Sequence, residues 1–200
     1  MNRLTTSLKW PVLAAACLGL AACGGGTKNA DIPSGSGDAS ATTTTSTTTS
    51  TTTTTAQPTF AKPTAAVTKI AGAIGTDTKK EPKIPKPSGK PPTKLTVVDV
   101  VKGKGAGAQD GNTLTVDYVG ASWSNGKVFD ASWNSGQPFP VTLGQTQVIE
   151  GWTQGLVGMK QGGRRLLVIP PDLGYGASGS PPKIKANETL IFVIDLRKKT

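Results

Sequence analysis

Two runs of the sequence contain almost no apolar residues, and they limit how much of the chain can form a packed core. Residues 41–56 are almost entirely threonine and serine, and residues 79–94 are largely lysine and proline. Neither run has enough apolar surface to offset the conformational entropy that ordering would cost. Residues 95–200 are long enough for one compact core. We therefore expect one folded domain over residues 95–200, preceded by a disordered tether over residues 23–94.

The first residues have the organisation of a bacterial secretion signal. Two basic residues precede an apolar run at residues 10–20, which is too short to span a bilayer permanently. The run ends in Leu-Ala-Ala-Cys, which resembles a lipobox, the motif whose cysteine is acylated and becomes the first mature residue. We expect residues 1–22 to be a lipoprotein signal peptide and a lipidated Cys23 to anchor the protein to the cell membrane, outside the cytoplasm. Ordinary cleavage after a small residue, with no role for Cys23, is the alternative.

The net charge of +10 at pH 7 is concentrated in the expected tether. The part of the chain before residue 95 has seven more basic than acidic residues, whereas residues 95–200 have three more. No basic stripe interleaved with aromatic residues falls on an expected folded element, so we predict no nucleic-acid partner. The cationic segment of the tether either meets anionic lipid or wall polymer or serves as a spacer.

The folded region combines strand patterns with one helical pattern. Alternating and β-branched segments predict strands at residues 95–101, 113–120, 127–132, 164–170 and 189–198. Asn125-Gly126 predicts a tight hairpin turn, because this pair tolerates positive φ. Within residues 147–163, apolar residues recur at helical spacing until Gly162-Gly163. The fold class indicated is α+β, an antiparallel sheet with one short helix across it.

Gly174, Gly176 and Gly179 have the spacing of a dinucleotide-binding loop. In such a loop the glycines follow a strand and open a helix, whose N-terminus binds the phosphates. Here two prolines precede the glycines, Pro181-Pro182 follow them, and no βαβ unit surrounds them. This context does not favour a helix, so the glycines are expected to shape a tight loop and no nucleotide is expected.

The composition of residues 95–200 excludes most kinds of catalytic chemistry. The chain has no histidine, and both of its cysteines precede residue 24. Triads and metal sites built on these residues are therefore absent, and we expect no metal, cofactor or disulfide. The carboxylates of this region are scattered, and all except Asp130 are interpreted as solvated surface charge. The others are Asp99, Asp110, Asp117, Glu150, Asp172, Glu188 and Asp195.

Several separate segments of residues 95–200 resemble the FKBP-type peptidyl-prolyl cis-trans isomerases, the macrolide-binding immunophilins. The segments are VDYVG, GKVFDAS, QPF, LGQTQVIEGWTQGLVGMKQGGRRLLVIPPDLGYGA and LIFVIDL, in the order and at the spacing of that family. The resemblance implies a five- or six-stranded antiparallel sheet wrapped around a short helix, with an apolar pocket between them. The expected lipidated tether is an addition to that family's minimal domain.

The resemblance also implies a set of site residues. Those implied in catalysis are Tyr118, Phe129, Asp130, Phe139, Trp152, Tyr175 and Phe192, and those implied in substrate binding are Val148, Ile149 and Ile184. Trp152 would form the pocket floor, and the Ile149 N–H and the Tyr175 O–H would bind carbonyl groups of the ligand. Three positions depart from the family pattern, one of them Gly174, where relatives often have alanine. Gln147 replaces an acidic residue, and Ser135 replaces a basic residue that can brace Asp130 and Tyr118.

Rotation about an X-Pro bond requires neither a nucleophile nor a proton acceptor. Its barrier of about 18–20 kcal/mol is lost amide resonance, and a dry aromatic pocket favours the twisted bond over the solvated planar amide. A domain without histidine or cysteine can therefore catalyse it. The resemblance implies a monomeric isomerase that binds proline-containing polypeptides, assists the folding of exported proteins and is inhibited by macrolides such as rapamycin. A proline-motif binding module with little or no turnover is the alternative.

Overall fold

In the computed structural model, which describes residues 60–200, six strands form one antiparallel sheet. The strands are β1 (Thr96–Val101), β2 (Thr113–Ser122), β3 (Val128–Ala131), β4 (Phe139–Thr142), β5 (Arg164–Ile169) and β6 (Leu190–Lys199). Their order is β1-β5-β6-β2-β3, and β4 pairs with β2 outside that path. Two α-helices, α1 (Ala65–Ala73) and α2 (Glu150–Leu156), and two 3₁₀-helices at Ser132–Asn134 and Pro171–Leu173 complete the fold. The expected α+β class is confirmed.

Every strand that the alternation pattern predicted is present in the structure. The pattern did not predict β4, which is four residues long and contains Pro140, so it offers too few alternating positions. The predicted hairpin turn between β2 and β3 is also present. Gly126 has a φ of +71°, and the Oδ1 of Asn125 accepts a hydrogen bond of 2.7 Å from the Lys127 N–H.

The central strands β5 and β6 are buried on both faces of the sheet. On one face, Leu167 and Ile194 belong to the hydrophobic cluster that includes residues of α2. On the other face, Leu166 and Val193 belong to a second cluster. Because both faces of these strands are apolar, both must be covered from water.

Helix α2 covers the first face at very close range. A Cβ added at Gly151 would lie 2.4 Å from the Ile169 side chain, and one added at Gly155 would lie 2.9 Å from the Leu167 side chain. Glycine at these positions therefore allows the helix backbone to rest directly on β5. This close approach sets the position of Trp152, which lies between the two glycines in the sequence.

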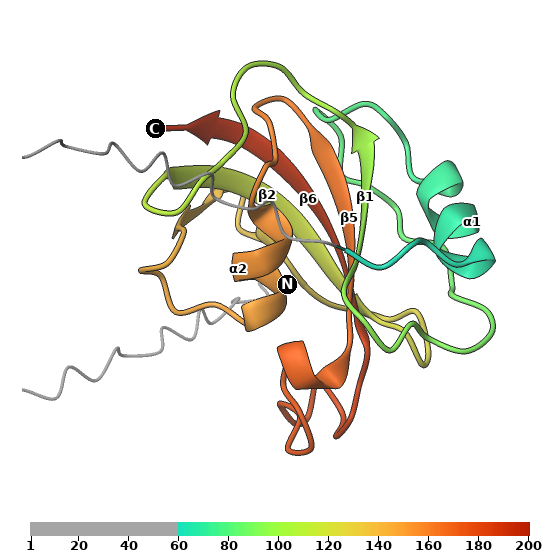
Figure 1. The fold of residues 1–200 in the computed structure, drawn as a ribbon. Coiled ribbons are helices and arrows are strands. Elements are labelled where there is room, and N and C mark those ends of the chain that lie inside the picture. The colour runs from blue at the N-terminus through green and yellow to red at the C-terminus, as the bar shows by residue number, and fades with distance from the viewer. Residues whose placement is uncertain (1–59) are drawn as a thin grey trace, which may run out of the picture. The chain divides into compact units, whose positions relative to one another are not determined.

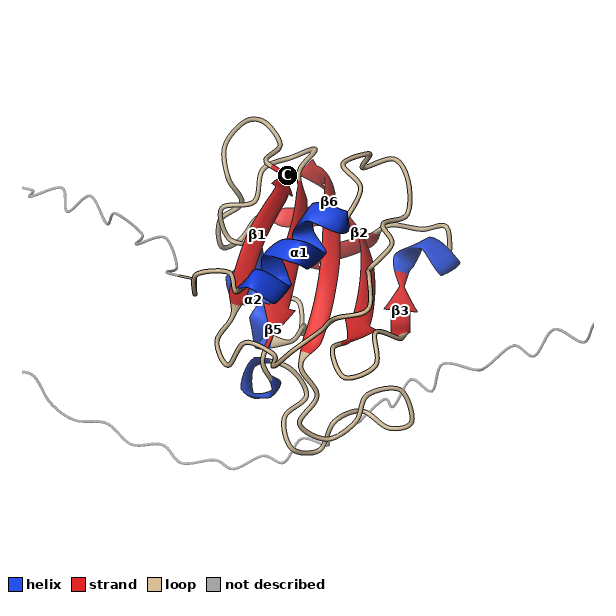
Figure 2. Cartoon of the chain, turned by 90° about the vertical axis from the view of Figure 1, so that its right-hand side faces the viewer, coloured by secondary structure: helices blue, strands red, loops and turns tan. Residues whose placement is uncertain are grey.

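Helix α1 covers the opposite face of the sheet, where no element was predicted (Figure 1). It crosses in front of the strands in Figure 2. The helix begins after Thr64, whose Oγ1 accepts a hydrogen bond of 3.4 Å from the Val67 N–H. Val67, Ile70 and Ile74 are at most 3% exposed and pack in the second hydrophobic cluster with apolar residues of β5 and β6.

The segment that follows α1 is held against the same face by side chains of the sheet region. The Arg164 guanidinium donates hydrogen bonds to the carbonyls of Gly75 and Lys80, at 2.5 and 2.8 Å. The Trp123 Nε1–H donates to the carbonyl of Gly89 at 3.2 Å. The expected tether over residues 23–94 is therefore wrong for residues 60–94, which belong to the folded unit.

The rest of the expected tether, the expected signal peptide at residues 1–22 and Cys23 lie outside the described residues. Within residues 60–200, no helix has the length and apolar character needed to cross a bilayer.

Three carboxylates expected to be solvated are buried, which corrects the sequence-based interpretation. Asp195 is 1% exposed and accepts two hydrogen bonds of 2.6 Å from Arg164. Asp117 is 8% exposed and pairs with Arg197 at 2.5 Å. Glu188 is 7% exposed, and both of its carboxylate oxygens accept hydrogen bonds from Ser124. Each partner is distant in the sequence, so local spacing could not reveal the pairing.

Candidate functional site

A pocket of about 510 Å³ is formed where α2, β2, β3, β4, β6 and the β5–β6 loop meet. Its lining residues are Tyr118, Phe129, Asp130, Phe139, Gln147, Val148, Ile149, Trp152, Tyr175 and Phe192. All of the expected site residues except Ile184 are therefore brought together at this pocket. Ile184 is 4% exposed and packs in the core beside it. Gln147, noted from the sequence only as a departure from the family pattern, is an additional lining residue.

The indole of Trp152 is the centre of an aromatic cluster. Its ring lies 5.2 Å from the ring of Tyr118 and 5.2 Å from that of Phe192, both edge to face. Edge-to-face pairs of this kind contribute about 0.5–1.5 kcal/mol each beyond the area they bury. Trp152 is only 4% exposed, and its Nε1–H is buried with no hydrogen-bond partner among the described residues. The floor of the pocket is thus a buried aromatic ring that is packed against the rings beside it.

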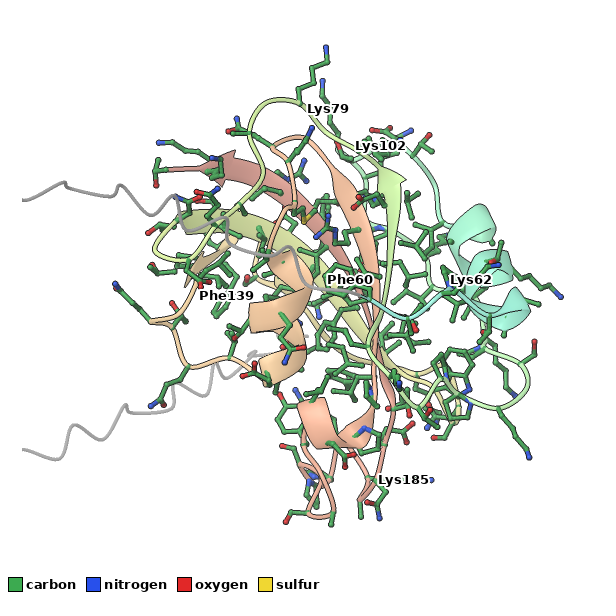
Figure 3. The ribbon with its side chains drawn as sticks, viewed as in Figure 1. Phe60, Lys62, Lys79, Lys102, Phe139 and Lys185 are labelled. Atoms are coloured by element: carbon green, nitrogen blue, oxygen red, sulfur yellow. The ribbon has the colours of Figure 1, made fainter. Side chains whose placement is uncertain are left out.

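The side walls come from three different strands. Phe129 of β3 and Phe192 of β6 pack edge to face at 5.6 Å. They meet over Gly120 of β2, where an added Cβ would lie 2.7 Å from Phe192 and 2.8 Å from Phe129. A glycine in β2 is therefore needed for these two rings to contact each other. Phe139 of β4, 38% exposed, forms the outer wall on the α2 side of the sheet (Figure 3).

The polar groups of the pocket are arranged around Asp130. The Tyr118 hydroxyl donates a hydrogen bond of 2.6 Å to the Oδ2 of Asp130. Burial, with this bond and the Asp130 charge, raises the pKa of Tyr118 far above its usual value. Burial also raises the pKa of Tyr175, with a smaller contribution from Asp130. Both phenols therefore keep their protons at neutral pH.

Ser135 does not take the place of the family's basic residue beside Asp130. Its hydroxyl donates a hydrogen bond of 2.8 Å to the carbonyl of Ser132 instead. The Ser132 hydroxyl in turn bonds Asp117 at 3.2 Å and accepts from the Tyr118 N–H at 3.0 Å. The Tyr118–Asp130 pair is therefore braced from the backbone side, and no ion pair within residues 60–200 involves Asp130.

The Ile149 N–H is a free donor at the edge of the pocket. Ile149 is the N-cap of α2, and its carbonyl accepts from the Trp152 N–H at 2.9 Å. No hydrogen bond from the Ile149 N–H is made within residues 60–200. The expected binding of a ligand carbonyl by this N–H is consistent with that geometry and stays a prediction.

The glycine-rich loop has no nucleotide-binding geometry. It lies between β5 and β6, and no helix follows its glycines. Gly176 and Gly179 have φ values of +58° and +62°, and an added Cβ at Gly179 would lie 2.5 Å from the Lys185 backbone. The glycines shape a tight loop that places Tyr175 at the pocket, as predicted from the sequence.

The residues that line the pocket include no serine, cysteine, lysine or histidine, and the one carboxylate, Asp130, accepts the hydrogen bond of Tyr118. Within residues 60–200 no group of three or more acidic, histidine or cysteine side chains could hold a metal ion. The pocket can remove water from a bound group and hold that group with a few hydrogen bonds. Those two effects are the ones that rotation about a prolyl amide requires.

Comparisons with known proteins agree with this geometry. Residues 104–197 match the family model described as FKBP-type peptidyl-prolyl cis-trans isomerase. The FK506-binding protein of Streptomyces anulatus is 51% identical over 117 residues, which is 58% of this chain and 94% of that protein. The FK506-binding protein of Neisseria meningitidis serogroup B is 46% identical over 52% of this chain and 94% of its own length.

Two further similarities concern a mammalian protein and a solved structure. The peptidyl-prolyl cis-trans isomerase FKBP2 of Mus musculus is 47% identical over 46% of this chain and 64% of its own length. The crystal structure of FkpA from Escherichia coli covers 56% of this chain and 51% of its own, with 41% identity and a TM-score of 0.49.

Proposed function

Because this chain belongs to the FKBP-type peptidyl-prolyl cis-trans isomerase family and is such an enzyme, we propose that it assists the folding of exported proteins at the outer face of a membrane. Slow X-Pro isomerisation limits the folding of many polypeptides, and an isomerase close to the site of export acts on chains that have just emerged. The aromatic pocket around Trp152 is the observation that carries the isomerase activity.

We propose the following roles for the pocket residues. The proline ring of the substrate rests on Trp152, enclosed by Phe139 and Phe192, and loses its water. In that environment the twisted amide, whose carbonyl is less polarised, is favoured over the planar amide. The Ile149 N–H and the Tyr175 hydroxyl hold neighbouring carbonyls of the substrate in a turn. The Tyr118 hydroxyl stays on Asp130 and keeps that wall in place.

The same pocket supports binding of macrolides. The relatives at 94% coverage are named as FK506-binding proteins, and the apolar lining of this pocket suits a bulky ligand of that kind. Rapamycin is therefore the inhibitor we propose for this chain.

The proposed location depends on the sequence of the first residues. A short apolar run ending in Leu-Ala-Ala-Cys supports acylation of Cys23, and residues 24–59 then connect the lipid to the folded unit. Substitution Cys23→Ser should move the protein from the membrane to the soluble fraction while leaving isomerase activity unchanged, because anchor and pocket are separate. A variant that stays in the membrane fraction would show that another segment provides the anchor.

A protease-coupled assay with an Ala-Leu-Pro peptide tests the catalytic part of the proposal. The full-length chain carrying Cys23→Ser should accelerate isomerisation above the buffer rate, and rapamycin should abolish the acceleration. Trp152→Leu should lower kcat/KM by about tenfold, or roughly 1.4 kcal/mol, because it removes the ring at the centre of the aromatic cluster. No acceleration, with rapamycin still bound, would instead identify a proline-motif binding module.

A further inference from the structure

A second depression adjoins the candidate active site and is rich in lysine. It has a volume of about 440 Å³ and lies between the β2–β3 hairpin and the β5–β6 loop. Lys127 and Val128 contribute from the hairpin, and Pro182, Lys183 and Lys185 contribute from the loop. Phe129 lines both this depression and the main pocket. We call this second depression the lysine groove.

The walls of the lysine groove are fixed by hydrogen bonds within the protein. Ser124, in the hairpin turn, donates to Glu188 from its N–H at 2.9 Å and from its hydroxyl at 2.7 Å. This contact joins the hairpin to the end of the β5–β6 loop. At the loop tip, Ser180 and Ile184 exchange two backbone hydrogen bonds of 2.9 Å. The groove is therefore formed before any ligand binds.

Exposed apolar surface continues from the main pocket into the groove. In the described part of the chain, the large hydrophobic side chains that are exposed are Val128 at 52%, Phe139 at 38% and Tyr175 at 40%. Phe139 and Tyr175 line the pocket and Val128 lines the groove. Exposed apolar side chains gathered in this way mark a binding surface, and here they trace a path from one depression to the other across Phe129.

The charged side chains that line the lysine groove are all positive. No carboxylate lines it, and none of the ion pairs formed within residues 60–200 involves Lys127, Lys183 or Lys185. The carboxylate of Glu188 is directed to Ser124 and is 7% exposed. Figure 3 shows Lys185 at the far end of the molecule from Lys79 and Lys102. The three ammonium groups thus lack an acidic partner in the described structure.

We infer that the lysine groove binds an acidic side chain of the substrate, so that the enzyme prefers proline segments carrying Glu or Asp close to the proline. The inference rests on the proposed use of the main pocket for the prolyl residue. Beyond the turn held in the pocket, an extended chain advances about 3.3–3.6 Å per residue, and Phe129 lines both depressions, so we place the acidic side chain roughly two to four residues from the proline. The lysines attract the acidic side chain and speed the encounter of enzyme and substrate. The fixed walls select the position of that side chain relative to the proline.

The test uses the full-length chain carrying Cys23→Ser and pairs of proline peptides that differ only by Glu or Gln. The acidic residue is placed in turn at two to four positions before and after the proline. At one of these positions the Glu peptide should have a kcat/KM about fivefold higher than its Gln partner at low salt, as expected for partly exposed ion pairs. The ratio should approach one at high salt.

Two triple variants separate the groove from the general charge of the protein. In Lys127→Gln/Lys183→Gln/Lys185→Gln the Glu-to-Gln ratio should fall to about one. In the matched control, Lys62, Lys79 and Lys102 are each substituted by Gln. None of these three residues lines the groove. This control removes the same charge and should keep the ratio. A ratio of one in the wild type at every position, or a preference that survives the groove variant, would overturn the inference.

Two further outcomes separate the proposed isomerase activity from the proposed role of the lysine groove. If neither the Glu nor the Gln peptides are accelerated, the proposed isomerase activity fails, and peptide affinities measured by fluorescence anisotropy then give the Glu-to-Gln ratio independently. If that ratio is one and phosphatidylglycerol vesicles bind the wild type but not the groove variant, the lysines serve a membrane surface and the inference is wrong.

Discussion

The two faces of the sheet are both closed by a helix, but the residues on them differ in kind and in purpose. Under α2 the packing is aromatic and incomplete, because Trp152, Phe139 and their neighbours leave a pocket. Under α1 the packing is mostly aliphatic, and Val67, Ile70 and Ile74 are at most 3% exposed. The comparison indicates that one face carries the function and that the other contributes stability without lining the pocket.

Removing residues 1–94 should produce the largest effect. The truncated chain loses the burial of Val67, Ile70 and Ile74, about 2 kcal/mol each, and exposes the apolar outer face of β5 and β6. We expect it to aggregate or to unfold at a much lower urea concentration than the full chain. A matched truncation that starts at residue 60 should unfold like the full chain. Equal midpoints for the chains starting at residues 60 and 95 would remove the stabilising role assigned to this segment.

Arg164→Met is expected to have the next largest effect. The guanidinium is 1% exposed and holds the buried Asp195 together with the carbonyls of Gly75 and Lys80. Removing one partner of a buried pair leaves the other charge uncompensated, which costs about 3–5 kcal/mol. Urea unfolding should show this loss, whereas Lys102→Met on the surface should leave the midpoint unchanged. A loss below about 1 kcal/mol would mean that Arg164 does not hold the segment.

Ile70→Ala tests whether the α1 face contributes stability without affecting catalysis. The substitution creates a cavity in a fully packed cluster, and such cavities cost about 2–4 kcal/mol. Isomerase activity per folded molecule should stay at the wild-type level, because no residue of this cluster lines the pocket. Calorimetry and the peptide assay on the same sample measure both quantities. A parallel fall in kcat/KM would show that the two faces are coupled.

Phe139→Ala makes the reciprocal change on the α2 face. The ring is 38% exposed and packs edge to face against Tyr118 and Trp152, at 6.0 and 6.2 Å. Its loss opens the pocket to water, so kcat/KM should fall about tenfold, or 1.4 kcal/mol. The melting temperature should fall less than in Ile70→Ala, since the Phe139 side chain is partly exposed and Ile70 is 3% exposed. A variant with normal kcat/KM would exclude this wall from catalysis.

The α2 face could be predicted from the sequence because its signals are local. Alternation in residues 189–198 predicted the strand β6, and Asn125-Gly126 predicted the hairpin turn. The family resemblance then brought together aromatic residues from separate strands. Ile184 is 4% exposed and packs in the first hydrophobic cluster, and its expected role in substrate binding stays a prediction.

The α1 face was missed because its sequence lies between two low-complexity runs. A signal was present: Val67, Ile70 and Ile74 repeat at helical spacing after Thr64, an N-cap residue. The helix has nine residues, which is too short for it to be stable alone. It is stabilised by a sheet face, and by Arg164 and Trp123, which are far along the sequence. Such contacts have no local pattern.

The pH dependence of catalysis tests most directly the claim that the pocket acts by desolvation and shape. The chain has no histidine, and no cysteine follows Cys23. Burial raises the pKa of Tyr118 and of Tyr175, so the folded chain holds these protons more tightly than the unfolded chain does. The contribution of these two tyrosines to the free energy of unfolding is therefore complete below a pH of about 10 and is lost only above that pH.

The measurement is kcat/KM for an Ala-Leu-Pro peptide from pH 5.5 to pH 8, on the wild type and on Asp130→Asn. The amide of the variant can still accept the Tyr118 hydrogen bond, so the wall should stay in place. Both profiles should be flat. A bell-shaped wild-type profile that Asp130→Asn flattens would show that a titrating carboxyl takes part in the reaction, and it would contradict catalysis by the aromatic pocket alone.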